Sequence, residues 1–289
     1  MKIIHYSLLF VLALVINACN DKEHKSKVND EVSLEENYLG QNPPGIEPQL
    51  FAPDLIKTEN REAEVAISPD LKAIYFRRRG GEYKTNALVV VRYKDNELTE
   101  SLIASKSGEP FIAPDGNTIH LGRNYRVKDS SGWSAVKLLG APFDKFPIMR
   151  LTVASNGTYY FDEASENGPL RYSRLVDGNY EEPKALNLDV GVWNAHPFIA
   201  PDESYIIWDD QRESGYGDSD LYISFRQQDN SWGPAINLGD KINTEFEDVY
   251  GSVSPDGKYF FFHRSYGGDK ADIFWVDAKT IFSLRNRNH

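Results

Sequence analysis

The stretch that decides the fold is Gly251–Phe262, which reads GSVSPDGKYFFF. A short run of small and apolar residues leads into Ser-Pro-Asp-Gly, and an aromatic run follows it. In such a turn proline presets the backbone angle, aspartate bonds the backbone just ahead, and glycine accepts a positive φ. The stretch therefore predicts two neighbouring strands joined by a tight turn.

The same pattern recurs along the chain. The other copies are VAISPDLKAIYF (65–76), PFIAPDGNTIHL (110–121), LTVASNGTYYF (151–161) and PFIAPDESYIIW (197–208). Counted at the turn residues Asp70, Asp115, Asn156, Asp202 and Asp256, the spacings are 45, 41, 46 and 54 residues. Four-stranded propeller blades repeat at about 40 to 50 residues. The sequence thus predicts an all-β fold, a β-propeller of five four-stranded blades, with six blades as the alternative.

The last copy lacks a candidate for its outer strand, because the chain ends at His289. The segment Ile46–Glu59 (IEPQLFAPDLIKTE) resembles Ser231–Glu245 (SWGPAINLGDKINTE), which follows the fourth copy. We therefore expect the amino-terminal segment to complete the last blade and remove a free sheet edge. The final stretch, from Ala278, is expected to form a short helical turn.

The Ser-Pro-Asp-Gly turn followed by YFFF resembles the TolB-type, WD40-like propeller repeat of bacterial envelope proteins. The resemblance covers about residues 43–284 and is clearest in 220–245 and 251–264. The third copy departs from the pattern with Ser155-Asn156-Gly157 at its turn. The resemblance implies a propeller that serves mainly as a binding or scaffolding module, although fold alone does not give function.

The amino terminus, MKIIHYSLLFVLALVINAC, has Lys2, an apolar stretch and then Ala18 before Cys19. This pattern predicts a secretory signal over residues 1–18. Its end resembles the lipobox of bacterial lipoproteins, which implies an acylated Cys19 and a lipid anchor in the cell envelope, on the periplasmic or outer-membrane face. Ordinary cleavage beside a coincidental cysteine is the alternative. Residues 19–42 are charged and predict a flexible tether, and 43–289 is the predicted propeller domain.

Charge and motif content argue against several classes of function. A net charge of −11 and a pI near 5.1 are unfavourable for binding nucleic acid. The six histidines show no zinc spacing, and no glycine-rich phosphate loop precedes a helix. The acidic loops 209–220 and 265–272 are interpreted as turn chemistry and not as calcium loops. We expect no metal, no cofactor and a monomer.

One equivalent position in each copy is polar or aromatic. It lies six residues before the turn residue and holds Glu64, Glu109, Arg150, His196 and Tyr250. Because innermost strands of a propeller begin near the central channel, we expect these side chains to ring a funnel and to bind a polar ligand, such as a sugar or a peptide terminus. A wet channel without a ligand would favour the same residue types.

Two functions remain open at this point. The first is a non-catalytic module that binds an envelope protein or glycan, with no catalytic residues. The alternative is a hydrolase acting on a glycan or lactone through Glu64 and Glu109, with Asp248 nearby, since paired carboxylates carry glycoside hydrolysis. The chain has no Gly-x-Ser-x-Gly elbow for a serine hydrolase.

Overall fold

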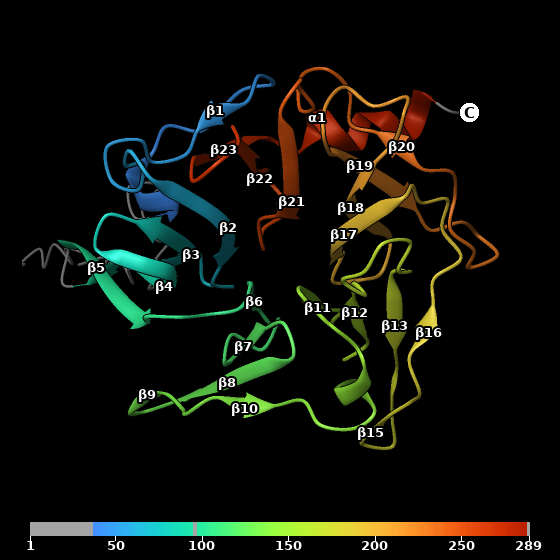
Figure 1. Ribbon diagram of the computed structural model, residues 1–289, viewed down its shortest axis with the longest axis horizontal. Coiled ribbons are helices and arrows are strands. Elements are labelled where there is room, and N and C mark those ends of the chain that lie inside the picture. Colours follow the sequence, from blue (N-terminus) through green and yellow to red (C-terminus); the bar gives the residue numbers. More distant parts are fainter. Residues whose placement is uncertain (1–36, 95–96, 288–289) are drawn as a thin grey trace, which may run out of the picture. The chain divides into compact units, whose positions relative to one another are not determined.

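The computed structural model describes residues 37–94 and 97–287, which belong to one compact unit. Strands dominate this part of the chain, and Figure 1 shows them in successive sheets around a central axis. None of the described helices combines the length and the apolar character needed to cross a bilayer. Within these residues the fold is therefore all-β, as predicted.

The strands pair antiparallel in arrays of four, and each array follows the previous one around the axis. The first array is β2 (Arg61–Ile67), β3 (Ala73–Gly80), β4 (Tyr83–Lys94) and β5 (Glu97–Ala104). The second is β6 (Pro110–Ile112), β7 (Thr118–Leu121), β8 (Asn124–Asp129) and β10 (Lys137–Leu138), and the third is β11 (Leu151–Val153), β12 (Tyr159–Phe161), β13 (Arg171–Ser173) and β16 (Lys184–Ala185). The fourth is β17 (Trp193–Ile199), β18 (Tyr205–Gln211), β19 (Asp220–Phe225) and β20 (Ile236–Asn237), and the last is β21 (Glu247–Val253), β22 (Tyr259–Ser265), β23 (Ala271–Asp277) and β1 (Gln49–Leu50).

Short elements decorate the arrays. They are the strands β9 (Gly132–Trp133), β14 (Leu175–Val176) and β15 (Asn179–Tyr180), the 3-10 turns Asn37–Gly40, Phe143–Lys145 and Ser283–Arg287, and the helix α1 (Lys279–Phe282). The helix confirms the turn expected near the carboxyl terminus. It buries Ile281 completely, and Phe282 packs edge-on against Tyr205 at 5.1 Å between ring centroids.

The turn residues act as predicted. Asp115, Asn156 and Asp202 each accept a hydrogen bond from the backbone N–H two residues ahead, at 2.8–3.0 Å. Asp70 and Asp256 accept the same bond at 3.1 and 3.2 Å. The glycines that follow, at 116, 157 and 257, have φ values of 67°, 85° and 74°. The local chemistry of the repeat therefore builds the inner hairpin of each array.

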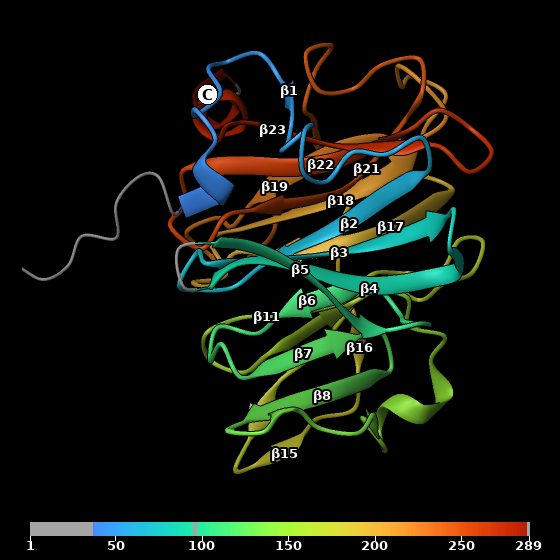
Figure 2. The same ribbon diagram turned by 90° about the vertical axis from the view of Figure 1, so that its left-hand side faces the viewer.

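The amino-terminal segment lies at the outer edge of the last array, where β1 pairs with β23 in the register Gln49↔Trp275 and Leu50↔Phe274 (Figure 2). This pairing is the one predicted from the likeness between the two ends of the repeat set. A parallel bridge, Arg61↔Ala271, also joins β2 to β23 and makes one continuous sheet of the last and first arrays. The ring thus has no gap between them, while the number of blades stays a prediction.

Packing of the body starts earlier than the predicted boundary at residue 43. Tyr38 and Leu39, assigned above to the tether, are 5% and 4% exposed. The Tyr38 hydroxyl donates a 2.6 Å hydrogen bond to Asp256, the turn residue of the last repeat, and its ring packs edge-on against Tyr259. The charged residues around them gave no sign in the sequence that Tyr38 and Leu39 pack into the hydrophobic core. Cys19 and the signal lie outside the described residues.

A buried histidine makes stability depend on pH. His120, on β7, is 2% exposed, and its ring packs edge-on against Tyr159 of the next array at 5.2 Å. Burial lowers the pKa of His120 to about 4. In an unfolded chain a histidine titrates near pH 6.5. Between these values only the unfolded chain takes up the proton, so His120 favours folding fully above pH 6.5 and loses this effect as pH falls to about 4.

We expect the contribution of His120 to the free energy of unfolding to fall by about 3 kcal/mol across this window, since one pKa unit is worth about 1.4 kcal/mol. His120→Phe keeps a ring against Tyr159 and removes the titration, so its loss of stability between pH 6.5 and 4 is smaller by that amount. Urea unfolding at several pH values measures the difference. Identical slopes in both proteins over this window are the result that this account does not allow.

Candidate functional site

Backbone bulges aim the inner-strand side chains at the axis. The register shifts by one residue within β2, β17 and β21, at the same point of each repeat. The residues in these bulges, Glu64, His196 and Tyr250, have φ values of 54°, 50° and 61°. Residues other than glycine rarely adopt a positive φ, and where they do, the surrounding structure stabilises that conformation. The repeated bulge therefore sets a common position around the axis.

The structure brings the five predicted side chains together, but not as an open funnel. Glu64, His196 and Tyr250 lie in the middle of their strands, and only Glu109 and Arg150 directly precede β6 and β11. Glu64, Glu109, Arg150 and Tyr250 are all less than 9% exposed. Glu64, His196 and Tyr250 therefore do not begin their strands as expected, because each lies in a bulge, whereas Glu109 and Arg150 do stand at strand starts.

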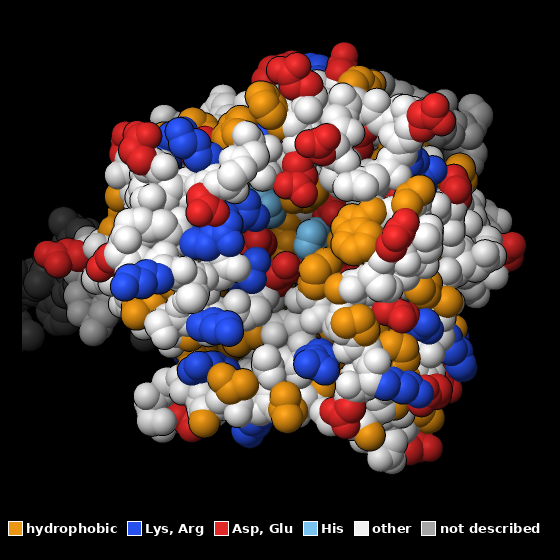
Figure 3. Space-filling view, in the orientation of Figure 1, with side chains coloured by type: hydrophobic (Ala, Val, Ile, Leu, Met, Phe, Trp, Pro, Cys, Tyr) orange, Lys and Arg blue, Asp and Glu red, His pale blue; other side chains and the backbone are white. Residues whose placement is uncertain are grey.

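A polar pocket opens above these side chains on one face of the ring. Its volume is about 240 Å³, and it is lined by Arg61, Glu64, Arg77, Arg79, Asn86, Glu109, His196, Glu247, Val249 and His263. Figure 3 shows this face, with pale-blue histidines in a central hollow between basic and acidic side chains. A cavity of this size is smaller than a drug-sized ligand site, and fits about one sugar ring or one amino-acid residue.

Two arginines form ion pairs with Glu64, a carboxylate of the polar pocket. Nε of Arg77 donates to Oε2 of Glu64, and Arg61 lies 3.2 Å from Oε1. Burial favours the neutral acid, but Arg77 outweighs it, and the pKa of Glu64 lies well below its usual range. Arg77 also lies 3.6 Å from Glu109. Glu64 is therefore a fixed anion with no proton to give.

His196 is a cation that contacts two carboxylates of this site. Its Nδ1 lies 2.8 Å from Asp209, and its Nε2 lies 3.5 Å from Glu109. Burial opposes the charged imidazole, yet the two carboxylates prevail and raise the pKa of His196 well above its usual value. His263, 3.4 Å from Arg61, behaves oppositely, because burial lowers its pKa well below the usual value. The pocket thus holds one charged and one neutral imidazole at neutral pH.

Arg150 and Tyr250 form a layer beneath the polar pocket. The guanidinium of Arg150 lies 3.6 Å above the centre of the Tyr250 ring. Its Nη1 donates to the backbone carbonyls of His196 and Gly251, both at 3.1 Å, and the Tyr250 hydroxyl donates to the carbonyl of Pro110 at 2.7 Å. This layer ties several inner strands together across the axis.

Two buried polar atoms of the polar pocket have no hydrogen-bond partner among the described residues. One is an acceptor, Oε2 of Glu109, whose nearest charged group is Nε2 of His196 in an ion pair at 3.5 Å, and the other is a donor, Nε of Arg79. Buried polar groups are nearly always paired, so such atoms in a cavity indicate where a ligand or water completes the bonding. A ligand that fits both offers a donor and an acceptor together.

Exposed aromatic side chains surround part of this face. We call Trp193, Tyr216, Phe246 and Tyr266 the aromatic rim; they are 38%, 50%, 37% and 38% exposed. Trp193 begins β17, and Phe246 directly precedes β21. Both therefore lie at the same strand ends as the pocket residues Arg61 and Glu247. Phe246 and Tyr266 pack edge-on with ring centroids 5.1 Å apart.

Sequence reasoning missed the partners of the inner-strand residues. Arg77, Asp209 and His263 all stand seven residues after their turn Asp, on the second strand of the array. Antiparallel pairing joins this position to the residue seven before the turn, as in Ala63↔Arg77, and so places it next to the bulge residue six before the turn. The signal was present in the aligned copies, but only one side of the turn was compared.

The other acidic candidates have structural partners. Asp248 is fully buried and pairs with Arg264 at 2.7 Å, and it does not line the polar pocket. Asp210, which was assigned to the acidic loop 209–220 but lies in β18, accepts hydrogen bonds from Gly191 and from the Trp208 indole. The part of the chain that the structure describes holds no group of three or more His, Cys, Asp and Glu side chains that could bind a metal.

Comparison with known proteins places this fold. Neither protein-family profiles nor curated sequences gave a match. Among solved structures, TolB from Acinetobacter baumannii is similar, with a TM-score of 0.51 and 17% identity over 76% of this chain and 53% of that one. This chain therefore spans about half of that TolB. The likeness confirms the expected β-propeller fold.

Two enzymes are also similar in shape. An α-L-arabinofuranosidase from Lactobacillus brevis has a TM-score of 0.49 and 13% identity, over 73% of this chain and 89% of that one. A gluconolactonase from Xanthomonas campestris has a TM-score of 0.48 and 10% identity, over 81% of this chain and 97% of that one.

Proposed function

We propose that this protein is a non-catalytic binding module that holds a partner protein of the bacterial envelope through the polar pocket and the aromatic rim. A polar chain end or side chain of the partner enters the pocket, where Glu109 accepts a hydrogen bond and Arg79 donates one. The predicted lipid anchor at Cys19 keeps the module at the membrane. The observation that carries this proposal is the polar pocket with two buried atoms, Oε2 of Glu109 and Nε of Arg79, that make no hydrogen bond to the described residues.

The aromatic rim favours a protein over a free small molecule. Aromatic residues and arginine are enriched at protein interfaces, and a few of them usually dominate the binding energy. Trp193 and Tyr216 are exposed, and Trp193 begins β17 at the strand ends where the charged cavity lies. This arrangement, an anchor pocket with an aromatic surround, is typical of a recognition surface.

The charges around the polar pocket support binding over catalysis. Glycoside hydrolysis needs one carboxyl group with a raised pKa that acts as acid and a second that acts as base or nucleophile. Glu64 is held ionised by two arginines, and Asp209 is paired with His196. Asp162, whose pKa burial raises to about 6, accepts backbone N–H bonds from Met149 and His196 and does not line the polar pocket.

A side-by-side screen of the full-length protein against short peptides and glycans tests the proposal. We expect peptide hits, and we expect Glu109→Gln to weaken them at least about tenfold, since losing one charged partner costs about 2 kcal/mol or more. Trp193→Ala is expected to weaken them by a similar factor as a rim anchor. Calorimetric titration of each variant gives the affinities.

The matched control is Glu97→Gln, which makes the same chemical change at an exposed position on the outermost strand of the first array. It should bind like the unaltered protein. Hits that are glycans only would replace the protein partner by a sugar. Peptide affinities that are unchanged in both Glu109→Gln and Trp193→Ala would remove the proposed site.

A further inference from the structure

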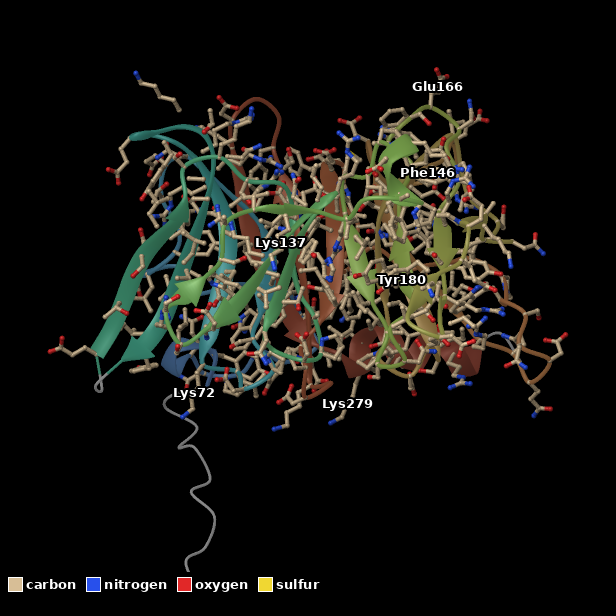
Figure 4. All side chains as sticks on the ribbon, turned by 90° about the horizontal axis from the view of Figure 1, so that it is seen from below. Lys72, Lys137, Phe146, Glu166, Tyr180 and Lys279 are labelled. Carbon is tan, nitrogen blue, oxygen red and sulfur yellow. The ribbon has the colours of Figure 1, made fainter. Side chains whose placement is uncertain are left out.

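A second cavity lies on the opposite face of the ring. Its volume is about 340 Å³, and it is lined mainly by apolar residues of the inner strands and by the turn prolines Pro69, Pro114, Pro201 and Pro255. Figure 4 shows the two faces: the labelled Lys72 and Lys279 lie at the turn end, and Glu166 lies at the other end. We call this cavity the apolar pocket.

The floor of the apolar pocket carries a buried charge. Arg150 lines the cavity and is 1% exposed. Its hydrogen bonds go to two neutral carbonyls, and no ion pair joins it to a carboxylate among the residues that the structure describes. Its Nε has no hydrogen-bond partner there either. A buried charge without a counter-charge is costly. An anion bound next to Arg150 would offset this cost.

The apolar walls of the cavity determine which kind of group can be attached to that anion. Val65, Ile112, Val153 and Phe198 come from four different arrays and have hydrocarbon side chains, and Ser252 and Ser254 are the uncharged polar residues of the lining. Phe111 and Tyr205 add ring surface. Burial of apolar groups against such walls is favourable by about 25 cal/mol per Å². The complementary ligand is therefore apolar along its length and anionic at one end.

We propose that the apolar pocket is a binding site for a small apolar carboxylate, whose head pairs with Arg150 and whose tail fills the space between the inner strands. The site is separate from the polar pocket, because the Arg150–Tyr250 layer lies between them and the two cavities share no lining residue. The proposal therefore stands or falls independently of the proposed partner protein.

The head group is tested with three probes of equal chain length, octanoate, 1-octanol and octylammonium, titrated calorimetrically into the full-length protein. Octanoate is expected to bind at least about tenfold more tightly than 1-octanol, since a charge-assisted bond to a buried arginine exceeds a neutral one. Octylammonium should bind most weakly. Equal affinities for octanoate and 1-octanol, or no octanoate binding at millimolar concentration, overturn the proposal.

Two variants separate head from tail. Arg150→Met should erase the preference for octanoate over 1-octanol, and a retained preference contradicts the assigned head site. Val153→Phe narrows the apolar pocket and should weaken both ligands several-fold, while Val136→Phe, at a 51% exposed position outside it, should weaken neither. If Arg150→Met does not fold, the probe comparison and the valine pair still decide the matter.

Discussion

Arg77→Met is expected to lower the free energy of unfolding by about 3–5 kcal/mol, because it leaves the Glu64 carboxylate buried beside a missing cation. Glu64 has only 4% of its side chain exposed, and Arg77 supplies its closest contact. Arg61, 3.2 Å away, neutralises it only in part. Urea unfolding of the full-length protein gives the change in free energy.

The double variant Arg77→Met/Glu64→Gln should recover most of that loss, since removing both charges also removes the desolvated anion. Arg79→Met, two residues along the same strand, is the matched control. Its partner Asp269 is 68% exposed, and such surface pairs contribute about 0–1 kcal/mol. Equal losses in the Arg77 and Arg79 variants would mean that the buried Glu64–Arg77 pair contributes no more to stability than a surface pair.

Phe51→Ala is the second large effect, with an expected loss of about 3–5 kcal/mol, as is usual for a buried phenylalanine. Phe51 directly follows β1 and is 2% exposed. Its ring packs edge-on against Phe261 and Trp275 at 5.1 and 5.2 Å, and its N–H donates to the carbonyl of Ile273. The substitution therefore opens a cavity where the amino-terminal segment joins the last array.

Ile46→Ala is the control for this segment. Ile46 is 60% exposed, so its truncation should change the free energy of unfolding by less than about 0.5 kcal/mol. A Phe51→Ala protein that unfolds at the same urea concentration as the unaltered one would show that β1 adds nothing to the closure of the ring.

Local chemistry explains why much of the fold could be predicted. The turn at Asp256 needs only its own neighbours, so the repeats and their inner hairpins are readable from the chain. The outer strand β1 was found because its sequence resembles the segment that contains β20. The likeness extends to contacts: Thr58 donates to Glu62 as Thr244 donates to Asp248, both at 2.7 Å.

The candidate site was less accessible, because it depends on pairing between strands and on distortions that no short motif encodes. The bulges at Glu64 and Tyr250 change the direction of these side chains and bury them. Burial of Tyr38 could not be foreseen from a segment so rich in charge, since it depends on the contact with Asp256, which is 218 residues away. The apolar pocket was missed because its walls come from separate repeats.

The most direct test of the central claim is an experimental structure of the full-length protein with a peptide hit bound. This account predicts an intact ligand in the polar pocket, within hydrogen-bond distance of Oε2 of Glu109 and Nε of Arg79, and in contact with the aromatic rim. A ligand bound at another surface, or one found cleaved beside Glu64 and Glu109, would contradict it.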